Sequence, residues 1–176
     1  MQPELRAAVV GVGSFGRHHA RIYHDLSDQG VRLVGLVDID PDGPKNVAER
    51  LSVPLVSSID ELPEAPHVVS VAVPTSVHRR VAAPLLERGI HCLVEKPVAG
   101  STHDASLLVD AAELGGAHLQ VGLVERFNPV MQALDRLTAP PVYIEVHRLA
   151  PLVLRAQDVG VVMDMMIHDL DIVRYV

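Results

Sequence analysis

The stretch Gly11-Val12-Gly13-Ser14-Phe15-Gly16 joins an apolar segment, residues 6–12, to a helical pattern over residues 15–26. It has the G-x-G-x-x-G spacing of a phosphate-binding loop between a strand and a helix. In such a loop the first glycine permits a tight turn, the second lets the backbone approach a pyrophosphate, and the third allows close packing of helix against strand. The sequence therefore predicts a dinucleotide site at the loop, with Ser14 and Phe15 beside the cofactor.

A second apolar segment, residues 31–38, ends in Asp38, about 20 residues beyond the loop, as the dinucleotide fingerprint requires. A carboxylate there accepts hydrogen bonds from the ribose hydroxyls of NAD. The 2′-phosphate of NADP would meet like charge, at a cost of about 1 kcal/mol in water and about 4 at an effective dielectric constant of 20. Ile39 and Asp40 supply no arginine to neutralise such a phosphate. We therefore expect NAD as the cofactor.

Strand and helix patterns alternate from the loop onward, with short connections. Strands are predicted at residues 6–12, 31–38, 68–73, 90–94 and 117–124, and helices at residues 15–26, 41–51, 76–88 and 102–114. This rhythm indicates an α/β protein with a parallel sheet covered by helices on both faces. We expect residues 1–124 to form an N-terminal, doubly wound Rossmann domain that binds NAD.

The rhythm changes after residue 124. Asn128 and Pro129 predict the start of a helix, residues 142–149 alternate with the period of a half-exposed strand, and another helix pattern begins near residue 162. A lone strand and its helices cannot bury their apolar faces. Residues 125–176 are therefore expected to begin a second α/β domain that is incomplete, in a chain truncated at its C-terminus.

Composition narrows the possible partners. The 176 residues carry a net charge of −7, which argues against nucleic acid or an anionic membrane. No run of 18 apolar residues predicts a membrane span. The single cysteine, Cys92, suits a reducing cytoplasm. We expect a cytoplasmic protein whose partner is a small molecule.

Candidate catalytic side chains follow two of the predicted strands. Glu95-Lys96-Pro97 comes directly after residues 90–94, where ligands bind in open α/β sheets, although Lys96 can equally be a solvated charge at a strand end. Pro74-Thr75 follows the neighbouring strand, and Thr75 can bond the ribose or phosphate of the cofactor. His78 is either a cofactor contact or a residue of a helix N-terminus.

A pair of titratable side chains lies near the end of the chain. Asp164 and His168 are four residues apart, which on a helix brings their Cβ atoms to about 5–6 Å. A carboxylate there orients the imidazole and favours its protonated form. The alternative is an amphipathic helix with solvated charges. Adjacent His18 and His19 point about 100° apart on their helix, so they predict ordinary packing or surface roles and no metal site.

Five motifs occur together in the order seen in the glucose–fructose oxidoreductase and inositol dehydrogenase (Gfo/Idh/MocA) family. They are the glycine loop, Pro74-Thr75 with His78, Glu95-Lys96-Pro97, Arg126-Phe127-Asn128-Pro129 and Asp164-x-x-x-His168. The resemblance covers the whole chain. It implies a Rossmann domain followed by a mostly antiparallel sheet that carries the subunit contact, so that the full-length protein is a homo-oligomer. It also implies NAD(P)-dependent oxidation or reduction of a sugar or polyol carbon.

The same resemblance assigns roles. It places Lys96 and His168 at the reacting carbon with Asp164 beside them, and it places Glu95 near the cofactor. The resemblance implies that the histidine removes the hydroxyl proton as a general base, while the lysine offsets the negative charge that develops on the oxygen. The usual family asparagine after the first proline is Thr75 here, which puts that cofactor contact in doubt.

A narrower resemblance points to bacterial UDP-N-acetylglucosamine 3-dehydrogenases. It rests on residues 124–129, 147–151, Arg155 and 158–171. It implies oxidation of the sugar C3 hydroxyl, with substrate contacts from Arg126, Asn128, Arg148 and Arg155. Arginine binds phosphate with two parallel hydrogen bonds, which suits a diphosphate, but each of these arginines can also be a surface charge.

Other interpretations remain open. The substrate can instead be inositol, a free sugar or an imine. The protein can be a nucleotide-sensing module without catalysis. The 176-residue chain can bind NAD and catalyse nothing, because its substrate domain is incomplete.

Overall fold

One parallel sheet of six strands forms the centre of the molecule. The computed structural model describes residues 4–40, 42–134, 139, 141–149 and 160–175. The sheet order is β3-β2-β1-β4-β5-β6, and every pairing is parallel. The strands are β1 (Leu5–Val10), β2 (Val31–Val37), β3 (Leu55–Val56), β4 (Val68–Val71), β5 (His91–Val94) and β6 (Leu119–Val121). The predicted Rossmann topology is confirmed, and the order in which strands are added to the sheet reverses between β1 and β4.

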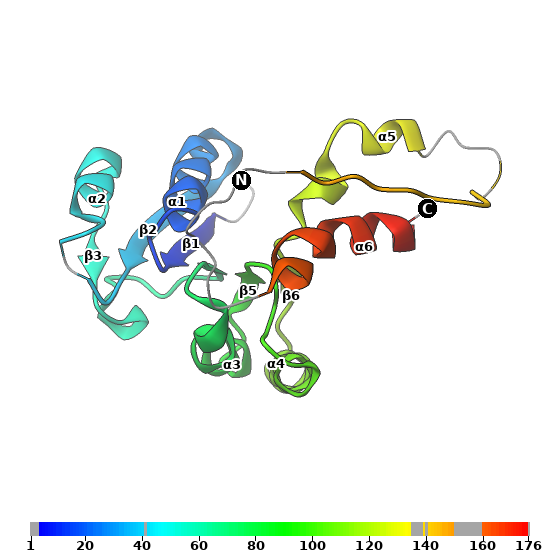
Figure 1. Cartoon of the computed structure of the whole chain (residues 1–176). Coiled ribbons are helices and arrows are strands. Elements are labelled where there is room, and N and C mark those ends of the chain that lie inside the picture. Colours follow the sequence, from blue (N-terminus) through cyan, green and yellow to red (C-terminus); the bar gives the residue numbers. More distant parts are fainter. Residues whose placement is uncertain (1–3, 41, 135–138, 140, 150–159, 176) are drawn as a thin grey trace.

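Helices cover both faces of this sheet (Figure 1). On one face α1 (Gly16–Asp25) contacts α2 (Lys45–Leu51), and on the other α3 (His78–Glu87) packs along α4 (Thr102–Gly115). Ser101 caps α4 because its hydroxyl accepts a hydrogen bond from the N–H of Asp104 at 3.1 Å. Gly116 ends that helix in the left-handed conformation, with φ of 62°.

Burial on both faces explains why the strands read as continuous apolar runs. Two hydrophobic clusters result, one centred on Val69, Val71 and Leu108 and the other on Val9, Leu36 and Val47. Cys92 belongs to the first cluster, and burial raises the pKa of its thiol to about 12. The thiol therefore stays protonated and has a packing role.

The structure differs from the expected elements in three places. The short strand β3 lies where no strand was predicted, since two residues are too few to show a period. The helix predicted to start at Asn128 and Pro129 begins at Met131 instead (α5, Met131–Leu134). The strand predicted at residues 142–149 pairs with no described strand, and these residues are exposed. Alternation of apolar and polar residues indicates a segment that can pair as a strand, but a strand forms only where a neighbouring strand supplies the hydrogen bonds.

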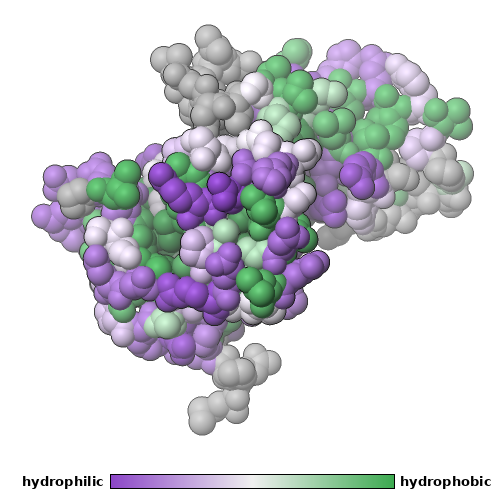
Figure 2. All heavy atoms as spheres, turned by 90° about the horizontal axis from the view of Figure 1, so that it is seen from below, coloured by the Kyte–Doolittle hydropathy of each residue, from purple (hydrophilic) through white to green (hydrophobic). Residues whose placement is uncertain are grey.

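The last described segment begins with a π-helical turn, Val162–Met166, and continues as α6 (Ile167–Tyr175). Helix α6 lies beside the 3-10 turn Val124–Phe127 that follows β6. Hydrophobic side chains gather on the end of the molecule that carries α5 and α6 (Figure 2). In the part of the chain that the structure describes, no helix is long and apolar enough to cross a membrane.

Candidate active site

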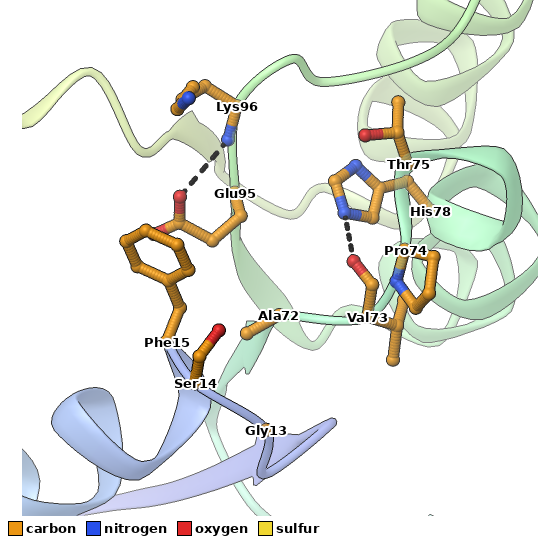
Figure 3. Close-up of a pocket in the computed structure, with 10 residues that line it drawn as sticks. All are labelled: Gly13, Ser14, Phe15, Ala72, Val73, Pro74, Thr75, His78, Glu95 and Lys96. Carbon is orange, nitrogen blue, oxygen red and sulfur yellow. Dashed lines mark hydrogen bonds between the residues drawn. The ribbon is translucent and has the colours of Figure 1, made fainter. Parts of the chain in front are cut away.

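Two cavities adjoin at the glycine loop. The first, of about 290 Å³, lies at the C-terminal ends of β4 and β5 and is lined by Gly13, Ser14, Phe15, Ala72, Val73, Pro74, Thr75, His78, Glu95 and Lys96 (Figure 3). The second, of about 440 Å³, shares Gly13 and Ser14 with it and extends past Asp38 to α2. An elongated ligand whose middle lies over the loop fits both cavities, as the pyrophosphate of a dinucleotide would.

The three loop glycines differ in what surrounds them. Gly11 has a φ of +81°, and a Cβ there would come within 2.7 Å of Val73 Cγ1. A Cβ on Gly16 would overlap the carbonyl oxygen of Gly11, so the fold itself requires both glycines. A Cβ on Gly13 would meet no atom within 4 Å. Gly13 lines both cavities just before α1, and a phosphate binds favourably at the N-terminus of a helix.

Asp38 lies just beyond β2 and joins the loop to the second cavity. Its Oδ2 accepts a hydrogen bond from the N–H of Val12 at 2.7 Å, and its Oδ1 accepts one from the N–H of Asp40 at 3.0 Å. Arg17 and Arg50 reach the same cavity from α1 and α2. The residues next to Asp38 in the sequence do not reveal these two arginines, because they belong to different helices.

Thr75 and His78 form the wall opposite Glu95. Thr75 is nearly buried at the start of the turn that leads into α3. The ring nitrogens of His78 lie 2.9 Å from the carbonyl oxygen of Val73 and 3.0 Å from that of Pro97. The ring therefore ties the end of β4 to the segment after Lys96. A contact between His78 and the cofactor stays a prediction.

Lys96 is turned toward the C-terminal segment. Its Nζ donates hydrogen bonds to the backbone carbonyl of Asp164 at 2.6 Å and to its Oδ1 at 2.7 Å. The structure thus differs from the expectation that Asp164 orients His168. Asp164 lies in the π-helical turn just before α6, and the side-chain partner of its carboxylate is Lys96.

His168 is half-buried at the start of α6. Its Nδ1 is buried and has no hydrogen-bond partner among the described residues. Burial, followed by the positive charges of Lys96 and Arg148, holds the pKa of His168 below its ordinary value. At neutral pH the imidazole is therefore uncharged, which is the form that accepts a proton.

The arginines expected at the substrate pair with acids of α6. Arg126 makes two hydrogen bonds to the carboxylate of Asp171, at 2.5 and 2.6 Å, and Arg148 Nε bonds that of Asp169 at 2.9 and 3.0 Å. Both acids are buried, so α6 is not a helix with a solvated acidic face. A role of the two arginines in substrate binding stays a prediction.

For Asn128 and Arg155, the other two residues expected to contact the substrate, the structure offers no direct support. The Asn128 amide donates to Glu125 Oε2 at 3.2 Å, and its Oδ1 accepts from the N–H of Val130 at 3.1 Å. These bonds shape the turn before α5. Arg155 lies outside the described residues.

The hydrogen-bond network behind Glu95 has no signature in the sequence. His19 Nε2 lies 2.8 Å from Glu95 Oε1, and His19 Nδ1 lies 3.2 Å from the hydroxyl of Ser70. That hydroxyl in turn lies 2.9 Å from the hydroxyl of Tyr23. His19 follows Gly16 by three residues on α1, which turns it toward the sheet. Of the two roles that the sequence left open for His19, the structure shows the one between helix and sheet.

Comparisons with known proteins agree with this geometry. Residues 5–123 match the family described as "Oxidoreductase family, NAD-binding Rossmann fold" (Gfo/Idh/MocA). The UDP-N-acetylglucosamine 3-dehydrogenase of Acidithiobacillus ferrooxidans is 37% identical over 169 residues, which cover 96% of this chain and 53% of that protein. An inositol 2-dehydrogenase of Agrobacterium fabrum is 29% identical over 97% of this chain and 54% of its own length.

Solved structures give the same result. The structure of UDP-N-acetylglucosamine 3-dehydrogenase GnnA from A. ferrooxidans superposes with a TM-score of 0.89 at 36% identity, over 98% of this chain and 56% of that one. GenD2 from gentamicin A biosynthesis, in complex with NAD, superposes with a TM-score of 0.83 at 27% identity, over 99% and 54%. The chain spans about half the length of the relatives it matches. With the fold, the glycine loop and these matches in agreement, the chain belongs to the Gfo/Idh/MocA oxidoreductase family, with its NAD-binding Rossmann fold.

Proposed function

We propose that the full-length protein is an NAD-dependent dehydrogenase that oxidises a hydroxyl-bearing carbon of a sugar, at C3 of UDP-N-acetylglucosamine. One observation carries the proposal. Lys96 lines the cavity at the end of β5, while its ammonium meets Asp164 and its charge reaches His168 in the segment that follows the Rossmann sheet. A cationic hydrogen-bond donor at the cavity thus has a neutral imidazole in its neighbourhood, and we place the nicotinamide end of the cofactor beside them.

The chemistry follows from these groups. When bound, NAD would supply the hydride acceptor for the oxidation of the alcohol to a ketone, which releases one proton. His168 takes the hydroxyl proton as a general base. Lys96 donates a hydrogen bond to the same oxygen and offsets its developing negative charge. Asp164 positions Lys96 through the ion pair at 2.7 Å.

The choice of a nucleotide sugar rests on two supports. The relative of 37% identity is named for UDP-N-acetylglucosamine, while the inositol dehydrogenases match at 29–31%. Arg126 and Arg148 also bind their aspartates through Nε and Nη2, so each keeps Nη1 to donate toward a phosphate. Arg155 and Asn128 are proposed as further substrate contacts.

The organisation of the full-length protein is part of the proposal. We place the boundary of the NAD-binding domain at residue 124, just after the last strand of the sheet, with residues 125–176 beginning a second domain for substrate and subunit contacts. Large apolar side chains are exposed in this second part, Val142 and Leu149 among them, which suits burial against further protein. We propose a cytoplasmic homo-oligomer.

The test is NADH formation by the full-length protein. UDP-N-acetylglucosamine, myo-inositol and free N-acetylglucosamine are offered with NAD, and absorbance of NADH is followed. Turnover with the nucleotide sugar supports the proposal, and turnover with inositol alone moves the substrate to the polyol class. Calorimetric NAD binding without turnover on any of the three would favour a nucleotide-sensing module. The same two measurements on the 176-residue chain decide whether it binds without catalysing.

A further inference from the structure

Glu95 presents a carboxylate to the cavity from the floor of the site. Its backbone follows β5, and its side chain extends toward Phe15 of the glycine loop (Figure 3). A Cβ on Gly122, just after β6, would lie 2.9 Å from Glu95 Oε1. The carboxylate therefore occupies a space that the absence of a side chain at Gly122 leaves open.

The network behind Glu95 suits the ionised carboxylate. When His19 carries its proton on Nε2, it donates to Glu95 Oε1, and its Nδ1 accepts from the hydroxyl of Ser70. Ser70 in turn accepts from the phenol of Tyr23, and burial, the main influence, raises the pKa of that phenol so that it keeps its proton. Each donor in this hydrogen-bond network then has one acceptor, and the network ends on the Glu95 carboxylate, which only accepts.

Glu95 stays charged although it is largely buried. Burial alone would raise its pKa, but the hydrogen bond and charge of His19, with the N–H and charge of Lys96, outweigh burial and hold the pKa of Glu95 below its ordinary value. Its Oε2 accepts from the N–H of Lys96 at 3.3 Å (Figure 3). A fixed anion therefore faces the cavity at neutral pH.

Apart from His19, which forms an ion pair with Glu95 only when its ring is protonated, the described cations near this anion are bound to other acids. Among the residues that line the first cavity, Glu95 and Lys96 have side chains that carry a full charge at neutral pH, and Lys96 forms an ion pair with Asp164. Arg126 and Arg148 are likewise paired with acids of α6. His168 is neutral at this pH because its pKa is lowered, chiefly by burial.

We propose that the Glu95 carboxylate, positioned by His19, makes the site select the redox state of its cofactor. The ring of oxidised nicotinamide carries a positive charge and the ring of NADH carries none, so the anion attracts the first and not the second. The site would therefore bind NAD⁺ more tightly than NADH, so that NADH leaves more readily once it has formed. The inference rests on the proposed place of the nicotinamide ring beside Glu95 and Lys96.

Binding affinities test this without turnover. The dissociation constants of NAD⁺ and NADH are measured by calorimetry, and NADH also by its fluorescence, for the wild type and for Glu95→Gln. The amide keeps the shape of the side chain and removes its charge. We expect the ratio of the NADH constant to the NAD⁺ constant to fall about fivefold or more, since unit charges roughly 4 Å apart interact by about 1 kcal/mol even in water.

Two further variants separate charge from structure. His19→Ala removes the donor to Glu95 and should lower the same ratio by a smaller factor, and His19→Gln, whose amide donates in place of Nε2, should restore it. The matched control is Glu113→Gln, an exposed carboxylate near the far end of α4, which should leave the ratio at its wild-type value. Circular dichroism and a thermal melt establish that each variant folds.

The outcomes are distinct. A ratio that stays within twofold of the wild type in Glu95→Gln and in His19→Ala, with both nucleotides still bound, overturns the inference alone. Equal weakening of NAD⁺ and NADH has the same meaning, because it reports a merely structural role. If the wild type binds neither nucleotide, the proposed function fails together with the inference.

Discussion

The ammonium of Lys96 lies 2.7 Å from Oδ1 of Asp164 and 2.6 Å from the backbone carbonyl of the same residue. The Lys96 side chain is only 14% exposed, so the pair is shielded from solvent on most sides. An ammonium has three N–H donors, and Asp164 takes two of them. The third remains for an oxygen at the cavity. Asp164 therefore fixes the direction from which Lys96 meets a substrate.

This arrangement predicts a large effect of Lys96→Ala on turnover. Loss of the donor at the reacting oxygen should lower kcat about 10²–10⁴-fold in the full-length enzyme, while NAD binding persists. The measurement is steady-state NADH formation, together with calorimetry for the cofactor. Lys45→Ala, an exposed lysine of α2, is the control and should keep wild-type turnover. Near-normal kcat in Lys96→Ala would remove this residue from the chemistry.

The lowered pKa of His168 predicts the pH at which kcat/KM falls on the acidic side of its pH profile. A base with a depressed pKa stays neutral to lower pH, so kcat/KM should fall only below the ordinary histidine value of about 6.5. Arg148→Gln removes a nearby positive charge and leaves Asp169 unpaired. Both changes favour the imidazolium, so the acidic limb should move to higher pH.

Arg174→Gln is the matched control for this profile, because Arg174 is exposed on α6. It should leave the acidic limb where the wild type has it. A profile of Arg148→Gln that coincides with the wild type, or one that moves to lower pH, would contradict the assignment of His168 as the titrating base.

The fold could be predicted from local signals, because each of them is carried by neighbouring residues. The spacing of Gly11, Gly13 and Gly16 and the continuous apolar strands are read within a few positions of the chain. The contacts that complete the site are not local. His19 and Glu95 are 76 residues apart, and Lys96 and Asp164 are 68 apart. No period in the sequence connects such pairs.

Two other features depend on geometry that a sequence pattern does not encode. The spacing of Asp164 and His168 suits one face of an α-helix, but the π-helical turn places Asp164 on Lys96 instead. Asp169 and Asp171 look like solvated acids, yet α6 turns them inward onto Arg148 and Arg126. Burying a carboxylate is favourable only with such a partner, and the partner is known only once the helix is placed.

Asp38 predicts the preference for NAD over NADP. Asp38→Ala removes the acceptor for ribose hydroxyls and the charge that repels a 2′-phosphate, while Arg17 and Arg50 remain at the same cavity. The ratio of the dissociation constant of NADP to that of NAD should therefore fall about fivefold or more. Calorimetry with both nucleotides measures it. Asp28→Ala, an exposed acid outside the cavity, should keep the wild-type ratio, and an unchanged ratio in Asp38→Ala would argue against this role.

Substitution of alanine for glycine in the glycine loop should have opposite effects at Gly13 and at Gly16. Gly13→Ala places a methyl group in open space, so the melting temperature should stay near that of the wild type while NAD affinity falls, because the methyl group takes the room of a phosphate. Gly16→Ala drives its methyl group onto the carbonyl of Gly11 and should lower the melting temperature by several degrees.

Gly100→Ala is the control for both, since a Cβ there also meets no atom within 4 Å and lies away from the cavities. It should change neither the melting temperature nor the affinity for NAD. If Gly13→Ala bound NAD as tightly as Gly100→Ala does, the pyrophosphate could not lie over the loop. The cofactor would then have to cross the sheet edge elsewhere, and the places given to Glu95 and Lys96 beside its ring would fall with it.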